Sequence, residues 1–200
     1  MSFPAFFADL PTLTLHDPLA EVLGAAEGGR LQYRYEDAVR LAGHSCPTVA
    51  GAWLMALRGL AFLHPGGLPR RGDIRVELRG AQDAGTTGVV GAVLSLITGA
   101  AGEGGFKGLG GRHARRGLLS YGADIPAEVR MTRLDTGASA LLDYHPELVP
   151  ADPEAAPLMA RVVGGVADAE EAAAFARHWQ ARVRRILTRH AEDPDLVVCR

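Results

Sequence analysis

The order of apolar and polar positions along the chain predicts several helices and strands. Residues 47–63 and 88–98 have the apolar repeat of buried helices, and both mix glycine and alanine with bulky side chains. Residues 73–79 alternate between apolar and polar positions, which predicts a strand with one buried face. Because small residues allow close approach, we expect both helices to pack tightly against their neighbours.

Shorter patterns predict the other elements. We expect helices at 17–25, 36–42, 158–163 and 168–190, and strands at 31–35, 118–121, 129–134 and 138–144. Asp17 is suited to cap the first of these helices, and Pro18 fits its first position. The triplet at 135–137, Asp-Thr-Gly, predicts the turn of the last hairpin. The predicted fold class is α+β, a mixed and largely antiparallel sheet packed by small-residue helices, with a C-terminal helical hairpin.

Proline content marks the expected domain boundary. Residues 146–157 contain four prolines, and we interpret them as a linker between a main domain at 1–145 and a C-terminal helical hairpin at 158–200. The apolar stripe of the last helix predicts that this hairpin packs on the main domain or on a second subunit. The apolar start, 1–7, lacks basic residues and is interpreted not as a signal peptide but as a tail whose aromatic side chains dock on the core or on a partner subunit.

Composition narrows the expected partners and location. Twenty-one basic and 23 acidic residues give a net charge of -2, which argues against nucleic acid or an anionic membrane as partner. No apolar run reaches the roughly 18 residues needed to span a bilayer. Cys46 lies in the central motif and Cys199 beside the C-terminus, so we expect no structural disulfide and a cytoplasmic location.

The segment 43–47, Gly-His-Ser-Cys-Pro, carries the clearest candidate chemistry. His44 and Cys46 lie two residues apart, and Cys46 occupies the N-cap position of the helix that Pro47 begins. The positive end of a helix dipole favours thiolate, the form that binds metals or attacks electrophiles. Imidazole and thiolate are ligands that zinc and iron accept. Two ligands cannot close a site, so at least one more must come from elsewhere.

Further ligands can be chosen only by residue type. The candidates are Asp83, His113 and His16. Asp83 is interpreted as a ligand, as a group that orients His44, or as an ordinary turn residue. A structural interpretation stays open for the whole motif, in which Cys46 is a small buried apolar residue and His44 is a hydrogen-bonded residue at a helix end.

Residues 99–117 contain eight glycines together with Lys107, the only lysine of the chain. Glycine permits close backbone approach and positive φ, which favours an anion cradle or a lid. The alternative is a floppy surface loop. In the first interpretation Lys107 neutralises an anionic substrate, and we predict it as a catalytic residue together with Asp83.

These two motifs resemble a known family. Residues 43–47, followed by a small-residue helix, resemble the signature of the FmdE family, which is named after a component of formylmethanofuran dehydrogenase, and residues 97–108 resemble its second motif. The similarity covers residues 17–144. It implies an α+β domain that binds a metal, often zinc, near the His-x-Cys motif and commonly forms a dimer. Two features differ: Ala100 and Ala101 stand where the family's second motif carries a cysteine, which argues against a thiol–disulfide role, and the zinc-ribbon tail of some members is absent.

We derive three functional hypotheses. The first is a metal-binding homodimer in which His44 and Cys46 hold zinc or iron beneath the glycine-rich segment, with Asp83 as base and Lys107 over the pocket. Its substrate would be a small anionic or one-carbon molecule. The second is a non-catalytic sensor or accessory protein that binds a metal or haem, since histidine and cysteine both ligate haem iron. The third is an interaction scaffold. The triplet at 135–137 also matches aspartic proteases, but a hairpin turn explains it.

Overall fold

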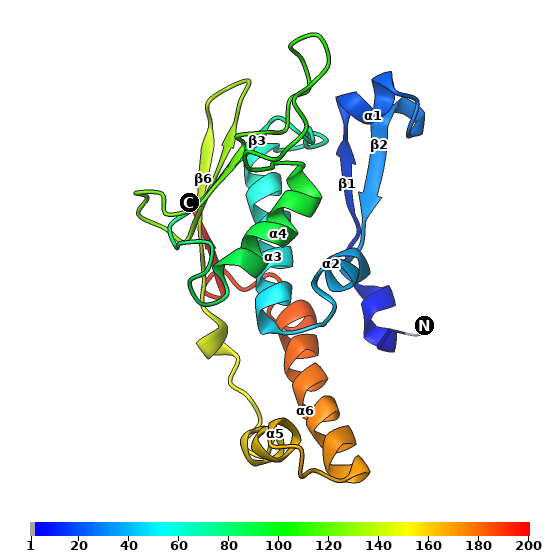
Figure 1. The fold of residues 1–200 in the computed structure, drawn as a ribbon, viewed down its shortest axis with the longest axis vertical. Helices are drawn as coiled ribbons and strands as arrows, with labels where there is room; N and C mark the ends of the chain where they lie inside the picture. Colours follow the sequence, from blue (N-terminus) through cyan, green and yellow to red (C-terminus); the bar gives the residue numbers. More distant parts are fainter. Residues whose placement is uncertain (1–2) are drawn as a thin grey trace.

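A computed structural model describes residues 3–200 and shows an α+β fold, as predicted (Figure 1). The helices are α1 Pro18–Val22, α2 Tyr35–Ala42, α3 Pro47–Leu63, α4 Thr87–Thr98, α5 Ala155–Val163 and α6 Ala169–Thr188. The strands are β1 Leu13–His16, β2 Arg30–Tyr33, β3 Ile74–Leu78, β4 Leu119–Ser120, β5 Val129–Arg133, β6 Ser139–Tyr144 and β7 Val197–Cys199. Short 3-10 segments span Ala5–Asp9, Glu27–Gly29 and Pro146–Leu148.

The main sheet is mixed and largely antiparallel, as the sequence predicts. Its strand order is β4-β3-β5-β6-β7, and only the pairing of β3 with β4 is parallel. At one end of the strands, Leu78 pairs with Val129, which pairs with Leu142; we call this the Leu78 end of the sheet. At the opposite end of the strands, Ile74 pairs with Arg133; we call this the Ile74 end. Strands β1 and β2 form a separate antiparallel hairpin on the far side of α3 and α4 (Figure 1).

Helix α3 lies at the centre of the molecule, between the main sheet and the other helices (Figure 1). Eleven of its 17 residues are buried, which explains its nearly continuous apolar pattern. Two glycines face the sheet. A Cβ atom on Gly51 would overlap the ring of Tyr144, and one on Gly59 would lie 2.7 Å from the Met131 sulfur. The expected tight packing through small residues is therefore present.

The C-terminal residues complete this core. The last turns of α6 bury Val183, Ile186 and Leu187 in the same apolar cluster as α3. Strand β7, which the sequence did not predict, pairs with β6. From α3, Arg58 donates hydrogen bonds to the carbonyl oxygens of Val197 and Ala191. The first turns of α6 and the packed helix α5 extend away from the main sheet (Figure 1).

The aromatic tail docks on the core, as expected for its described residues. Phe3 stacks on Phe7, Phe6 packs edge-on to Phe7, and Phe7 packs edge-on to the buried Tyr35. The first two residues of the predicted tail lie outside the described residues. Among the helices of 3–200, none has the length and apolar character that would let it cross a membrane.

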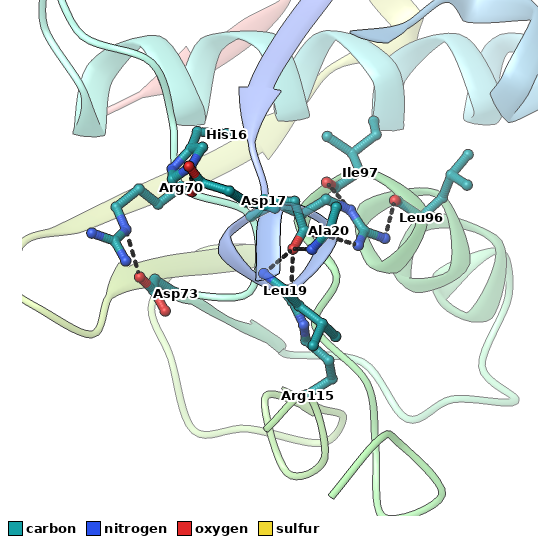
Figure 2. A network of polar contacts seen from close by, with 11 residues as sticks. His16, Asp17, Leu19, Ala20, Arg70, Asp73, Leu96, Ile97 and Arg115 are labelled. Atoms are coloured by element: carbon teal, nitrogen blue, oxygen red, sulfur yellow. Dashed lines mark hydrogen bonds and ion pairs between the residues drawn. The ribbon is translucent and has the colours of Figure 1, made fainter. Parts of the chain in front are cut away.

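A buried ionic network fixes the glycine-rich segment at the Ile74 end (Figure 2). Asp17 caps α1 through the backbone N–H groups of Leu19 and Ala20. Its carboxylate also pairs with Arg71 at 2.8 Å and with the buried Arg115 at 2.6 Å. The network therefore joins α1, the residues before β3 and the glycine-rich segment.

Glycine is required at position 72, where the Arg115 side chain packs directly against the backbone. Gly72 has a φ of +88°, and a Cβ atom there would overlap the Arg115 guanidinium. The guanidinium of Arg71 also donates hydrogen bonds to the carbonyl oxygens of Leu96 and Ile97, at the end of α4. These contacts make residues 99–117 an anchored segment rather than a floppy loop.

Candidate functional site

The motif that contains His44 and Cys46 forms the connection between α2 and α3. Helix α2 ends at Gly43, whose φ of 74° is the left-handed conformation expected of a helix-terminating glycine. Cys46 has extended backbone angles and is the N-cap of α3, as predicted, and its Sγ accepts the backbone N–H of Val49 at 3.5 Å. His44 is exposed, and its Nδ1 lies 2.9 Å from the carbonyl oxygen of Ala42. Both predicted metal ligands thus lie on one short connection.

Ser45, between the two candidate ligands, is held from two sides. Its hydroxyl lies 3.0 Å from the hydroxyl of Tyr35, on α2. Its carbonyl oxygen accepts hydrogen bonds from Trp179 Nε1 at 2.9 Å and from Gln180 Nε2 at 3.1 Å, both on α6. Because these partners come from separate helices, the backbone between His44 and Cys46 has a fixed path.

Two phenol groups border the same connection. The hydroxyl of Tyr144 donates a hydrogen bond to the Pro47 carbonyl oxygen at 2.9 Å. Burial raises the pKa of Tyr35 and of Tyr144 well above the usual value, and the negative charge of a Cys46 thiolate would raise both further. Both phenols therefore stay protonated at neutral pH and can donate hydrogen bonds near the candidate site.

Gln180 has an unsatisfied hydrogen-bond acceptor beside the connection between α2 and α3. Its Nε2 is used by Ser45, while its Oε1 is buried and has no hydrogen-bond partner within the described part of the chain. An unpaired buried acceptor costs about 1–3 kcal/mol, so such an atom commonly marks a bound water or ligand. Sequence reasoning missed Gln180 because 135 residues separate it from Ser45.

Asp83 lies at the same end of the molecule as His44. It is exposed in the turn between β3 and α4, beyond the Leu78 end. The first turn of α4, at Gly88 and Val89, lines a hollow together with Leu41 and Ala42, just before His44. Of the three further ligands proposed by residue type, Asp83 is the one that the fold places on this side.

Lys107, His113 and His16 lie near the Ile74 end instead. Lys107 is exposed in the glycine-rich segment, which Arg115 anchors to Asp17. The 17 residues of α3 span about 25 Å and separate this segment from the His44 connection (Figure 1). The sequence motifs predicted that Lys107 covers a pocket at His44 and Cys46. Within one chain, the structure does not place Lys107 there.

The other cysteine lies in the sheet. Cys199 is part of β7 and pairs with Leu142, and both cysteines are free thiols. Burial raises the pKa of the Cys199 thiol above its ordinary value. A protonated, half-buried thiol in a strand is a poor nucleophile and a poor metal ligand, so Cys199 serves as a comparison for Cys46.

A group of three side chains able to hold a metal ion was not predicted. The carboxylates of Asp152 and Glu154 and the imidazole of His178 each offer a ligand atom, and these atoms lie within 4.8 Å of one another. The first two residues precede α5, and His178 belongs to α6. A pair of carboxylates before one helix and a histidine on the next helix was the available signal, but it depends on how the two helices pack.

Comparison with known proteins gives no independent assignment. No family model matches the chain, and a search of curated proteins finds no significant match.

Proposed function

We propose that this protein binds a metal ion, zinc or iron, at the N-terminal end of α3, with His44 Nε2 and Cys46 Sγ as two of the ligands. The observation that carries the proposal is the hydrogen bond between His44 Nδ1 and the Ala42 carbonyl oxygen. This contact fixes the proton on Nδ1 and leaves Nε2 as the basic atom, the arrangement that metal-binding histidines generally use.

The position of Cys46 supports the same proposal. Its sulfur lies at the N-terminus of a 17-residue helix and accepts a backbone N–H group. Both features stabilise a negative charge on sulfur, and thiolate is the form that ligates zinc. The hydrogen bonds that hold Ser45 fix the backbone between the two ligands, which lowers the entropy lost on metal binding.

The remaining coordination positions would be taken by water, by a small anionic or one-carbon ligand, or by a second copy of the chain. Gln180 Oε1 is an acceptor suited to a bound water or to a ligand N–H group. Asp83 is the candidate base at this end. Lys107 would contribute only from the second subunit of a homodimer, because Arg115 anchors the glycine-rich segment of its own chain to Asp17, at the Ile74 end.

The haem alternative gains less support. A haem group needs a wide apolar slot beside its axial ligand. Tyr35, Tyr144 and Trp179 instead direct polar atoms at the residues on either side of Cys46. A small ion suits these surroundings better than a macrocycle, so we base the function on a metal ion, with or without catalysis.

Replacing Cys46 by serine tests this proposal. Serine is a preferred N-cap residue, so the helix should keep its cap and the protein its thermal stability. Loss of the thiolate should lower metal affinity at least about tenfold, because changing a residue that merely orients a ligand already costs about that much. Cobalt(II) titration measures this directly, because a thiolate ligand gives a charge-transfer band that oxygen and nitrogen ligands lack.

Cys199→Ser is the matched control and should keep the band. His44→Ala should weaken cobalt binding without unfolding the protein, since His44 is exposed. An unchanged thiolate band in the Cys46→Ser protein would refute the proposal.

A further inference from the structure

The helical hairpin carries a second group of metal-ligand side chains, apart from the His44 and Cys46 connection. A turn before α5 brings two carboxylates together: the backbone N–H of Glu154 donates to Asp152 Oδ1 at 3.0 Å, and that of Ala155 donates to the Asp152 carbonyl oxygen. His178, on α6, faces both carboxylates. Its Nδ1 lies 3.2 Å from Asp152 Oδ2, and its Nε2 lies 3.4 Å from Glu154 Oε2.

These separations suit metal ligands. They are slightly longer than the 2.8–3.1 Å of the other histidine–carboxylate pairs in the described residues, and longer than the 2.6–2.9 Å of the arginine–carboxylate pairs. In a tetrahedral zinc site with bonds of about 2.0–2.2 Å, neighbouring ligand atoms lie about 3.3–3.6 Å apart. An imidazole binds an ion through one nitrogen, so one carboxylate oxygen already lies at ligand spacing from that nitrogen. Because one ligand atom of each of the three residues lies within 4.8 Å of the others, side-chain rotation would direct the second carboxylate at the same ion.

The donor set also matches a divalent ion in charge and chemistry. Two carboxylates would balance a doubly charged ion, and carboxylate with imidazole suits zinc or manganese. The positive charge of Arg185 also interacts with Asp152 and would compete with a bound cation, so we expect moderate rather than very high metal affinity.

An apolar hollow of about 180 Å³ adjoins these ligands. His178 lines it together with Ala155, Met159, Phe175 and Trp179. An ion held by three protein ligands keeps an open coordination position for water or for another donor. The hollow gives that position a neighbouring space in which the apolar part of a metal-bound molecule fits.

We propose that Asp152, Glu154 and His178 form a metal site for a divalent ion of the zinc or manganese class, which joins α5 to α6 beside this hollow. The site is separate from the one proposed at His44 and Cys46. The experiment on the hairpin site therefore uses protein in which His44 and Cys46 have been replaced, so that each proposal can fail without the other.

The test is zinc titration by calorimetry on the full chain carrying His44→Ala and Cys46→Ser. We expect about one zinc ion per chain to remain bound. Adding Glu154→Gln or His178→Ala should lower the affinity at least about tenfold. The Glu154 side chain is 78% exposed, so its replacement should leave the fold intact. His190→Ala is the control, because His190 pairs with Asp193 in a similar way outside the cluster.

Hydrogen exchange supplies the second measurement. Zinc should slow amide exchange in α5 and in the first half of α6, and this protection should disappear in Glu154→Gln. Absence of zinc binding in the double-variant background would overturn the proposal. Equal affinity in the Glu154→Gln, His178→Ala and control proteins would also overturn it, because the zinc would then be bound elsewhere.

Discussion

Replacement of Asp17 by asparagine is expected to lower the free energy of unfolding by about 3–5 kcal/mol. Asp17 is 3% exposed and neutralises two guanidinium groups, those of Arg71 and Arg115. Arg115 is itself 6% exposed, and apart from Nη2, which pairs with Asp17, its guanidinium nitrogens have no hydrogen-bond partner in residues 3–200. Asparagine keeps the shape and the helix-capping oxygen, so the loss measures the uncompensated buried charge. Equilibrium unfolding in urea gives the value.

Glu103→Gln is the matched control for this prediction. Glu103 pairs with Arg116 in the same glycine-rich segment, but the two side chains are 83% and 46% exposed. Exposed pairs contribute about 0–1 kcal/mol, so this variant should unfold close to the wild type. If Asp17→Asn lost no more stability than Glu103→Gln, the buried network would not be what anchors the segment.

Asp17 should also make the free energy of unfolding depend on pH in the acid range. Burial alone would raise the pKa of Asp17, but hydrogen bonds from Arg71 and Ala20 and the charges of Arg115 and Arg71 together lower it below 3.8. The unfolded chain therefore binds the proton more readily, so this contribution is full above the unfolded pKa and is lost as pH falls through the folded pKa. Between about pH 5 and pH 2, Asp17→Asn should show a flatter fall in stability than wild type.

Alanine at Gly51 is expected to cost about 1–3 kcal/mol by overpacking. Its Cβ would overlap the Tyr144 ring, and Tyr144 is 9% exposed, so the ring has little room to move. Any shift also strains its hydrogen bond to the Pro47 carbonyl oxygen, one residue from Cys46. Gly51→Ala should therefore weaken metal binding as well as stability, which cobalt titration and thermal unfolding would measure.

Gly59→Ala is the control, on the same helix and the same face. Its Cβ would meet the Met131 sulfur at 2.7 Å, and a methionine side chain adapts more easily than a tyrosine ring. The higher helix propensity of alanine, about 1 kcal/mol over glycine, offsets part of the cost equally at both positions, so the difference between them reports the packing. We therefore expect a clearly smaller loss at Gly59. Equal losses at both positions would contradict the packing described for Tyr144.

Strongly patterned elements could be predicted from the sequence alone. Helix α3 has the predicted limits, α4 begins one residue earlier than predicted, and β3 is one residue shorter at each end, because long apolar repeats and helix-ending glycines are local signals. Strands β1 and β7 were missed. They contain four and three residues, too few to show an alternation, and the pairing of β7 with β6 depends on the path of the whole chain.

The candidate site likewise has features that could be predicted from neighbouring residues and features that depend on residues distant in the sequence. The capping role of Cys46 follows from its neighbours and was predicted, whereas the hold of Trp179 on Ser45 spans 134 residues and has no local signal. The placement of Lys107 failed for a related reason. A glycine-rich motif indicates an unusual backbone, but the end at which it lies is set by Arg115 and its buried partner 98 residues away.

X-ray absorption at the zinc edge tests the central proposal most directly. The protein would carry Cys199→Ser and Glu154→Gln, so that Cys46 is the only cysteine and the hairpin site is weakened, and would be loaded with one equivalent of zinc. We predict one sulfur neighbour at about 2.3 Å and at least one nitrogen neighbour at about 2.0–2.1 Å. A first shell of oxygen and nitrogen alone would contradict a metal centre at His44 and Cys46.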